Sequence, residues 1–461
     1  MPLGLIGLWF SLSFVLVTCA LWPEAFQRLR WPLVAAVVLV LAASIALAWS
    51  GPLDPIPRWR AGLAFDPLAR LVLPAVWVGA SAAVLSALFT GAGRYEPGIA
   101  ALSVAVATAG ILSANPLLTI ALLQAGALIV LAGLLVHDEG LAGHPFLNVA
   151  TSLKYLTLTV LSSACLVMAL LLSSFYALNP DRVEITRIVA AVFAVGFGLA
   201  AGAVPFYFHM PDVFEAAPGL ATTSLAGPLQ CLAFVYLIRT AANYPWLLTD
   251  EHVSSVLAGG ALAGGLLAAI MAFGPRRVNR ILAFNALREV SWVAFGLASA
   301  SRAGWSGALV ILAVRCLSEP LGILTARVAQ AIAGESDLDK LGGLARLLPL
   351  AAAGSCAASF ASVGLPPAAS FWGLASLFAA AAGGTGAVLL VGSGLLGVWR
   401  LAQLNYAIFW RRGRAEQAAP EPWGLRVVVG GVALALLAGG LVPRLLQSPI
   451  DQLLAGVPFL R

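Results

Sequence analysis

The sequence predicts an all-α, polytopic membrane protein. Hydrophobic residues make up 61% of its 461 residues and charged residues only 10%, whereas roughly a quarter of an ordinary soluble domain is charged. Apolar runs of about twenty residues recur along the chain, and each is long enough to cross the ~30 Å hydrocarbon core as a helix. The runs show none of the period-two alternation that a transmembrane β-barrel requires. A soluble fold is therefore excluded.

The apolar runs predict about 14 transmembrane helices. They lie at residues 2–22, 31–50, 70–90, 97–115, 116–136, 149–174, 188–208, 219–240, 253–273, 280–300, 304–333, 346–382, 385–411 and 424–445. The twelfth run is too long for one straight helix, and we expect Pro366 and Pro367 to break it, because proline removes a backbone donor. Pro205 should act similarly near the end of the seventh. The first run lacks a basic leader, so we expect a retained helix rather than a cleaved signal.

The two discontinuous helices, near Pro205 and Pro366, lie five spans apart. Their surroundings are weakly alike, with GAVPF at 202–206 and GLPP at 364–367. This pattern predicts two inverted five-helix repeats, since an odd number of spans inverts the second copy, as in many secondary transporters. The predicted units are three N-terminal helices with an interfacial segment at 1–96, the first repeat at 97–241, the second repeat at 242–412, and a C-terminal helix and tail at 413–461.

The net charge of +6 is carried almost entirely by arginine, since Lys154 and Lys340 are the only lysines. In a membrane chain this excess sets orientation and does not indicate nucleic-acid binding. The odd-numbered loops carry more Lys and Arg than the even-numbered ones, which predicts that both termini face outside. Residues 51–68 combine prolines with arginines and aromatic residues, and we predict a short interfacial segment there.

Ionisable side chains inside the spans are the candidates for an ion path, because burying a charge in the bilayer costs at least ~2.5–3.5 kcal/mol. They are Lys154, Arg288, Glu289, Arg315, Glu319 and Arg400. Arg315 and Glu319 lie four residues apart on one helix face, so they form either a self-contained ion pair or part of a relay. Arg288 and Glu289 point in different directions, and Glu289 could meet Lys154 or Arg315. Lys154 lies near a helix start and either snorkels to the interface or joins the relay.

The five cysteines lie singly in apolar stretches, without the C-x-x-C spacing of a metal or iron–sulfur site. They are expected to be small core residues. The most distinctive loop is VPFYFHMPDVFEAAP at 204–218, which contains Pro205, His209, Asp212 and Glu215. We expect this loop to be ordered. A purely structural interpretation also holds, because Asp212 after a proline can cap a helix and His209 can tie down the loop.

Several of these segments resemble the antiporter-like membrane subunits of respiratory complex I, and most of all its subunit N. The loop at 204–218 resembles the family pattern VPFH-W-PDVYEGAP, and SLKY at 152–155 resembles its sixth-helix lysine segment. NRILAF at 279–284 is similar to K-R-L-L-A-Y, and GLPP at 364–367 followed by SFWG at 370–373 is similar to the family's broken helix. The likeness covers spans 3 to 14 in order. The superfamily also includes subunits of membrane-bound hydrogenases and cation/proton antiporters.

The resemblance implies a line of buried lysines, a glutamate and a histidine that carries protons along the membrane mid-plane. Most of these positions are replaced in this sequence: Gln124 for a glutamate, and Ala200, Gln230 and Leu374 for lysines. The tenth-helix histidine falls on Glu289, and only Lys154 is retained. A proton can wait only on a titratable group. We therefore expect a structural, non-pumping subunit. The alternatives are rewired conduction through Lys154, Glu289, Arg315, Glu319 and Arg400, or a stand-alone secondary transporter.

The resemblance also implies a setting in the bacterial or archaeal inner membrane. There the chain would be a non-redox subunit of a translocase similar to NADH-quinone oxidoreductase or to membrane hydrogenase, with no catalysis of its own. We expect no cofactor in this chain, because no soluble domain is long enough to house one. Iron–sulfur clusters, flavin or a NiFe centre would belong to partner subunits. The expected partners are other antiporter-like membrane subunits, a redox peripheral arm and the lipid bilayer.

Overall fold

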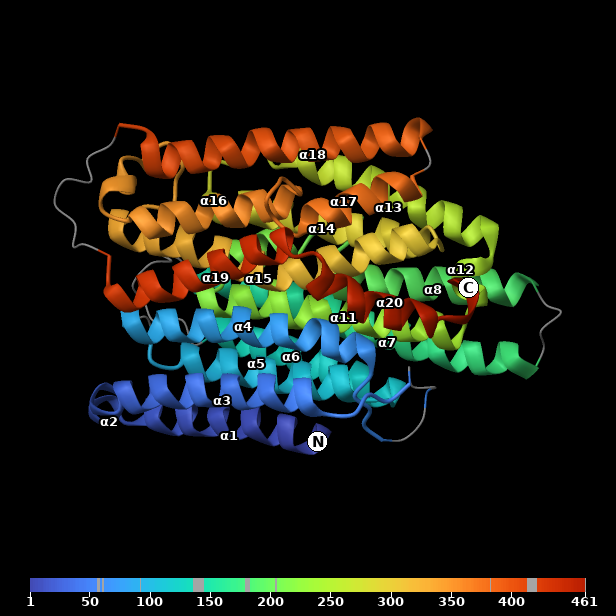
Figure 1. The fold of residues 1–461 in the computed structure, drawn as a ribbon, viewed down its shortest axis with the longest axis horizontal. Helices are drawn as coiled ribbons and strands as arrows, with labels where there is room; N and C mark the ends of the chain where they lie inside the picture. Colours follow the sequence, from blue (N-terminus) through green and yellow to red (C-terminus); the bar gives the residue numbers. More distant parts are fainter. Residues whose placement is uncertain are drawn as a thin grey trace.

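In the computed structural model, the chain folds into a bundle of long, roughly parallel helices (Figure 1). The structure describes residues 1–55, 59, 62–91, 93–135, 145–178, 183–203, 205–381, 383–412 and 421–460. In these ranges there is no β-strand, and the only β-type pairings are two isolated bridges, Leu63 with Ser113 and Arg277 with Asp337. The predicted all-α membrane fold is confirmed.

The first half of the chain contains helices up to α12. They are α1 (Pro2–Leu21), α2 (Pro23–Arg28), α3 (Arg30–Ser50), α4 (Pro67–Thr90), α5 (Glu96–Leu112), α6 (Pro116–Leu135), α7 (Pro145–Leu178), α8 (Val183–Ala201), α9 (Met210–Ala216), α10 (Gly219–Ser224), the π-helical turn η1 (Leu225–Leu229), α11 (Gln230–Asn243) and α12 (Trp246–Thr249). Helices α10, η1 and α11 follow one another without a gap and form one continuous rod.

The second half begins with α13. Its elements are α13 (Glu251–Met271), α14 (Val278–Ala298), α15 (Arg302–Ala333), η2 (Leu344–Arg346), α16 (Pro349–Val363), α17 (Ser370–Ala380), α18 (Gly384–Asn405), η3 (Tyr406–Trp410), α19 (Trp423–Leu441), α20 (Arg444–Ala455) and η4 (Pro458–Leu460). Over the described part of the chain, 11 helices are long and apolar enough to cross a membrane. Shorter apolar helices, including α5, α16 and α17, accompany them. The count of fourteen spans and the inverted repeats stay predictions.

Two helices are interrupted, and in both the break begins at a glycine. Helix α8 ends at Ala201 and Gly202 has φ +70°; helix α16 ends at Val363 and Gly364 has φ +72°. This left-handed conformation is disfavoured for residues with a side chain and ends a helix without strain at glycine. The seventh span was predicted to run to residue 208 and is therefore shorter than expected. Pro205 lies in the first gap, and Pro366 and Pro367, joined by a cis peptide bond, lie in the second.

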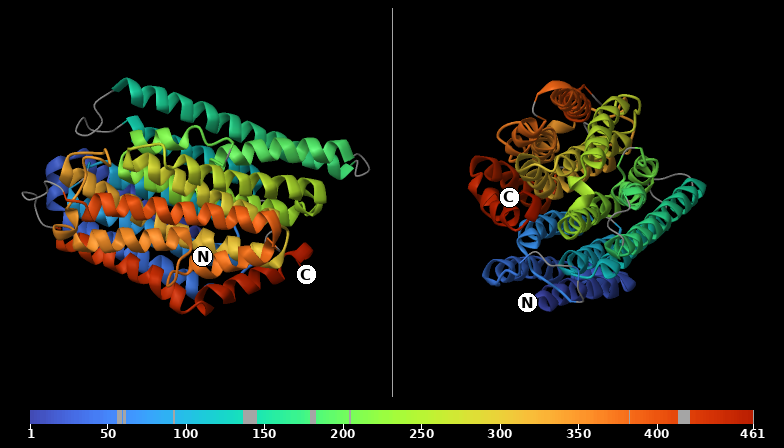
Figure 2. Two further views of the ribbon diagram at one scale, coloured as in Figure 1. Left: turned by 90° about the horizontal axis from the view of Figure 1, so that it is seen from above. Right: turned by 90° about the vertical axis from the view of Figure 1, so that its right-hand side faces the viewer.

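The centre of the bundle is built from segments in the middle of the chain. In the most apolar 18-residue stretch of each span, all residues of Gly219–Asn243 are buried, as are 94% of those of Val278–Ala298 and 83% of those of Arg302–Ala333, against 22% for Arg30–Ser50. The end-on view in Figure 2 places the green and yellow helices between the blue N-terminal and the orange and red C-terminal helices. Polar side chains on the central helices are therefore held away from both water and lipid.

The end of the segment predicted to be interfacial packs into the bundle; residues 56–58 and 60–61, including Arg58 and Arg60, lie outside the described residues. Ala64 and Phe65 are buried, and the Ala64 N–H donates to the Leu112 carbonyl at 2.8 Å. Asp66 caps α4 by accepting from the Ala69 N–H at 2.8 Å. The interfacial position of the segment stays a prediction.

Candidate functional site: a polar axis between the two broken helices

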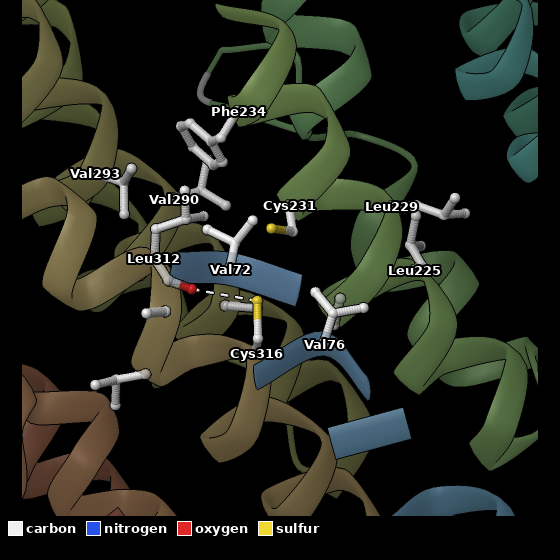
Figure 3. Packing of buried hydrophobic residues seen from close by; sticks show 14 of the residues in the cluster. Val72, Val76, Leu225, Leu229, Cys231, Phe234, Val290, Val293, Leu312 and Cys316 are labelled. Atoms are coloured by element: carbon white, nitrogen blue, oxygen red, sulfur yellow. Dashed lines mark hydrogen bonds between the residues drawn. The ribbon is translucent and has the colours of Figure 1, made fainter. Parts of the chain in front are cut away.

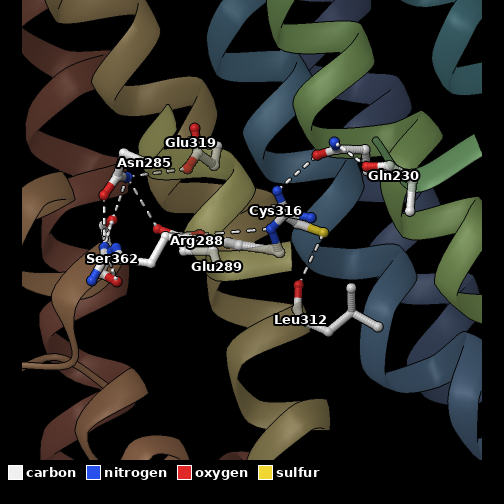
Figure 4. Close-up of polar contacts among 10 residues, drawn as sticks. Gln230, Asn285, Arg288, Glu289, Leu312, Cys316, Glu319 and Ser362 are labelled. Atoms are coloured by element: carbon white, nitrogen blue, oxygen red, sulfur yellow. Dashed lines mark hydrogen bonds and ion pairs between the residues drawn. The ribbon is translucent and has the colours of Figure 1, made fainter. Parts of the chain in front are cut away.

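Gln230 links the end of broken helix α8 to helix α15. Its Nε2 donates to the carbonyl of Ala201, the last residue of α8, at 2.8 Å, and its Oε1 accepts from Arg315 Nη2 at 2.7 Å. The side chain is fully buried. It follows the π-helical turn Leu225–Leu229, in which Pro228 interrupts the regular hydrogen bonding. The Gln230 amide therefore uses both of its ends to join two helices (Figure 4).

Arg315 connects Gln230 to helix α14. Its Nε lies 3.6 Å from Oε2 of Glu289, and both side chains are 1% exposed. The sequence left open whether Arg315 pairs with Glu319 one turn along α15 or whether Glu289 meets Lys154. The structure places the ion pair between Arg315 and Glu289. This pair is longer than a normal hydrogen bond, so its attraction is mainly that of charge.

The buried polar contacts that run from Ala201 through Gln230 and Arg315 to Glu289 form what we call the axis. Asn285 contacts the remaining groups of this axis. Its Nδ2 lies 3.4 Å from Oε1 of Glu289, 3.5 Å from Oε1 of Glu319 and 2.5 Å from the Ser362 hydroxyl oxygen. Its Oδ1 accepts from Arg288 Nη2 at 2.6 Å. Two carboxyl groups from different helices thus lie around one amide, and the axis reaches the last turn of broken helix α16 at Ser362.

Arg288 closes the far end of the axis. Its Nη2 donates to the carbonyl and hydroxyl oxygens of Ser362, both at 3.1 Å, and its guanidinium lies 4.4 Å from the ring centroid of Trp292. The Trp292 indole in turn donates to Ser393 of α18 at 3.0 Å. The axis therefore joins α8, α11, α15, α14 and α16 in sequence, from one helix break to the other.

The four charged residues of the axis, two arginines and two glutamates, sum to zero formal charge. Balance of this kind reduces the cost of placing charges at membrane depth. In the described part of the chain several of their atoms are buried without a protein hydrogen-bond partner. These atoms are Nε and Nη1 of Arg288, Oε2 of Glu289, Nε and Nη1 of Arg315, and the nearby Ser318 hydroxyl. Such groups are those that internal water satisfies.

Lys154 lies away from this axis. Its Nζ is 2.6 Å from Oδ2 of Asp212 and 2.6 Å from the Phe208 carbonyl, and its side chain is 40% exposed. Asp212 also accepts from Arg280 of α14 at 3.2 Å. Lys154 therefore belongs to a partly exposed ion-pair group around α9.

The loop that contains α9 is held by charges rather than by a helix cap. Glu215 pairs with Arg280 and, at 2.5 Å, with Arg277. Asp212 was predicted to cap the helix, but the capping position is His209, without a side-chain cap bond. Asp212 makes ion pairs instead. His209 is 2% exposed and its ring lies 5.7 Å from that of Tyr155. Burial, aided by the nearby positive charge of Lys154, lowers the pKa of His209 to about 4.

The other candidate positions named from the sequence make none of the contacts of the axis. Gln124 accepts from the Ser163 hydroxyl of α7 at 2.9 Å. Leu374 fills the space beside Gly364, where an added Cβ would come within 2.9 Å of it. Ala200 packs against the core. Arg400 donates to the carbonyls of Ala272 at 2.7 Å and Pro275 at 2.8 Å, which ties α18 to the turn before α14.

One buried ion pair escaped the sequence analysis. Arg239 near the end of α11 donates from Nε and Nη2 to Oδ2 of Asp66, at 3.2 Å and 3.0 Å, and from Nη1 to the Ser113 carbonyl at 2.7 Å. Their side chains are 1% and 0% exposed. Asp66 directly precedes Pro67, and this capping signal could have indicated an ordered site. Within the described ranges, no three His, Cys, Asp or Glu side chains are grouped as a metal site requires.

Comparison with known proteins matches residues 114–398 to the transmembrane family described as NADH:quinone oxidoreductase/Mrp antiporter. NADH-quinone oxidoreductase subunit 14 of Thermus thermophilus is 27% identical over 455 residues, which cover 95% of this chain and 96% of that protein. NADH-quinone oxidoreductase subunit N of Methylobacterium nodulans is 26% identical over 89% of this chain and 88% of its own length.

Solved structures show the same fold. A chain of the Mrp complex from Dietzia sp. DQ12-45-1b superposes with a TM-score of 0.83 at 17% identity, covering 99% of this chain and 97% of its own. A chain of respiratory complex I from Thermus thermophilus superposes with a TM-score of 0.75 at 23% identity, covering 96% and 98%. The expected fold is therefore supported independently of the sequence motifs.

Proposed function

Because the chain belongs to the family of NADH:quinone oxidoreductase and Mrp antiporter transmembrane proteins, we propose that it is a subunit N-like membrane-arm component of a complex I-like assembly. We further propose that this subunit is structural and moves no protons through its own centre. The observation that carries the second proposal is Gln230, whose amide spans from the Ala201 carbonyl to Arg315. A primary amide can donate and accept hydrogen bonds but cannot hold a transferred proton at membrane depth.

The residues outside the axis on the N-terminal side of Gln230 support this proposal. Gln124 accepts a hydrogen bond from Ser163, and Ala200, next to the α8 break, has no polar side-chain atom. Lys154 is engaged by Asp212 at an exposed position. A proton that reached Gln230 from this side would therefore find no titratable side chain among the replaced positions.

The part of the axis that lies toward the C-terminal half is charged but suits a different role. Arginine keeps its proton in proteins, so Arg288 and Arg315 act as fixed positive charges. Arg315 faces Glu289 of α14, and Arg288 donates to Ser362 of α16. Leu374 packs beside Gly364 at the α16 break. The cluster is therefore suited to fixing the mutual positions of α14, α15 and α16, which keeps the scaffold rigid for its neighbours.

The proposed partners are other antiporter-like membrane subunits and a redox peripheral arm in a bacterial or archaeal inner membrane. The named relatives are subunits of NADH-quinone oxidoreductase and support this assignment. Any redox cofactor would lie in the partner chains. Purification in mild detergent tests the assignment: we expect several membrane and iron–sulfur chains to co-purify. A chain that purifies alone and transports a solute in liposomes would contradict it.

The test of the non-pumping role is Glu289→Gln in the intact assembly. We expect the number of protons moved per NADH oxidised, measured in inverted membrane vesicles with a pH-sensitive dye, to stay unchanged. Glu251→Gln, at an exposed position in the first turn of α13, is the matched control for loss of one carboxylate. A native gel confirms that both variants assemble. Loss of proton movement in an assembled Glu289→Gln complex alone would overturn the proposal.

Loss of proton movement in the Glu289→Gln complex would favour rewired conduction. One observation supports this alternative. Glu289 and Glu319 lie on either side of the Asn285 amide, within 3.4 Å and 3.5 Å. Two carboxyl groups so placed can pass a proton between them, directly or through water. Glu319→Gln distinguishes the structural role from rewired conduction further. Conduction through Glu289 and Glu319 requires both acids, so either substitution should stop proton movement. The structural role predicts unchanged proton movement in both Glu289→Gln and Glu319→Gln.

A further inference from the structure

Two cysteines that are far apart in the sequence meet beside the polar axis. Cys231 follows Gln230 on α11, and Cys316 follows Arg315 on α15. Both are 1% exposed. The Cys316 thiol also lies 3.3 Å from the Leu312 carbonyl, which it contacts as a donor. Figure 3 shows the two sulfur atoms facing one another among apolar side chains.

The packing around the two thiols is uneven. On the α15 side, the backbone of Cys316 lies directly against Gly79 of α4, where an added Cβ would clash with the Cys316 carbonyl oxygen. Cys316 is therefore held in place. On the α11 side, Cys231 comes just after the π-helical turn Leu225–Leu229. A π-helical turn is a local irregularity that is frequent at functional sites.

We propose that Cys231 and Cys316 are a reversible dithiol–disulfide site that cross-links α11 to α15 beside the Gln230–Arg315 hydrogen bond. On oxidation both S–H bonds break and one S–S bond forms, and two protons and two electrons pass to an uncharged two-electron oxidant that enters the bilayer. Reduction by a dithiol reverses the step. The cross-link adds a covalent constraint to the helices that Gln230 already joins, so the oxidised protein has a more rigid axis.

A disulfide requires Cα atoms about 4.4–6.8 Å apart and thiols that point toward each other. The arrangement of the two sulfur atoms in Figure 3 meets the second requirement. Cys165 on α7 and Cys356 on α16 are partly buried and provide internal references. This inference concerns a modification of the chain and is independent of whether the axis conducts protons.

The experiment treats native membranes with diamide, whose N=N bond takes up the two protons and two electrons. Digestion without reduction, followed by mass spectrometry, should reveal Cys231 and Cys316 joined as the dominant cross-link, and dithiothreitol should remove it. After denaturation, the oxidised chain should accept two fewer N-ethylmaleimide groups than the untreated chain. Cys231→Ser should abolish both changes, whereas Cys165→Ser should abolish neither.

A Cys316→Ser variant repeats the test from the other helix, and melting of untreated variants in detergent establishes that they fold. Two results would overturn the proposal. One is that folded protein treated with diamide accepts as many N-ethylmaleimide groups as untreated protein. The other is that Cys231 or Cys316 links to Cys165 or Cys356 as often as to its proposed partner, which would mean that spatial proximity in the fold does not direct the reaction.

Discussion

Two buried ion pairs, Arg239 with Asp66 and Arg315 with Glu289, differ in how completely they are satisfied. In the first, all three guanidinium nitrogens have partners, and Asp66 accepts from both Arg239 and the α4 backbone. In the second, the closest charged atoms are 3.6 Å apart, and Nε and Nη1 of Arg315 have no hydrogen-bond partner in the described residues. Equal burial therefore does not mean equal contribution to stability.

The difference follows from what surrounds each pair. Arg239 meets one carboxylate at the end of the bundle, where a helix cap and the Ser113 carbonyl hold fixed positions. Arg315 lies in the centre among two glutamates, an amide and a second arginine, so its charge is compensated by several neighbours at longer range. A closed pair of the first kind is sensitive to removal of one partner, while a distributed cluster can redistribute its contacts.

The largest effect is expected from Asp66→Asn. The amide still caps α4, but Arg239 loses its counter-charge in a site without water access. Breaking a buried pair in this way typically costs about 3–5 kcal/mol. We expect low yield and a markedly lower melting temperature in mild detergent. The control is Asp451→Asn, which removes an exposed pair with Arg302 at 3.5 Å and should change neither quantity. Equal effects of the two substitutions would show that burial does not set the cost.

A smaller effect is expected from pH, through a third buried group outside the spans. Burial lowers the pKa of His209 to about 4, from about 6.5 in the unfolded chain. As the pH falls from about 6.5 to 4, the unfolded chain takes up a proton that the folded chain does not, so stability falls with acidity by at most about 3 kcal/mol. Melting curves between neutral and acidic pH measure this.

His209→Gln removes the proposed cause and should flatten the acid-side slope. His252 provides the matched control, because it is exposed at the start of α13, and His252→Gln should leave the slope unchanged. If the slope persists in His209→Gln, the acid sensitivity belongs to the carboxylates of the two ion pairs. Measurements that compare those pairs belong at about pH 8, where His209 is uncharged in the folded protein and almost entirely uncharged in the unfolded chain.

Glu289→Gln should destabilise the protein less than Asp66→Asn. Arg315 keeps its hydrogen bond to Gln230 and stays near Glu319, so the expected loss is that of one interaction with a charged group, about 1.5–3 kcal/mol. Melting temperature measures it. A double-mutant cycle with Arg315→Gln isolates the pairwise term, which should be smaller than that between Asp66 and Arg239. A larger coupling in the central pair would reverse the comparison from which these predictions start.

The sequence predicted the helices well because a transmembrane helix is encoded in contiguous residues. The run at 116–136 corresponds to α6 at Pro116–Leu135. The break near Pro205 was predicted from proline, yet α8 already ends before Gly202, because the left-handed conformation rather than the missing N–H stops the helix. The charged residues of the axis were identified as candidates, since a charge in an apolar run is conspicuous.

The partners of those residues could not be predicted, because they depend on which helices are neighbours. Arg239 and Asp66 are 173 positions apart, and Asp66 lies outside every predicted span. Cys231 and Cys316 each look like an isolated small residue in an apolar run. Asn285 and Ser362, which hold the axis together, are uncharged and so gave no signal in a search for ionisable groups. Such contacts are set by packing geometry rather than by residue type.

The smallest effect tests whether the central cluster is pliable. An alanine Cβ at Gly397 on α18 would lie 2.5 Å from Nη1 of Arg288, so Gly397→Ala must displace the end of that side chain. If the cluster redistributes its contacts, the guanidinium shifts and the loss stays near the lower end of the about 1–3 kcal/mol that overpacking costs. Gly259→Ala, with open space around the added Cβ, is the matched control and should be neutral or stabilising. Failure of Gly397→Ala to fold would mean that the central cluster is as rigid as the Arg239–Asp66 pair.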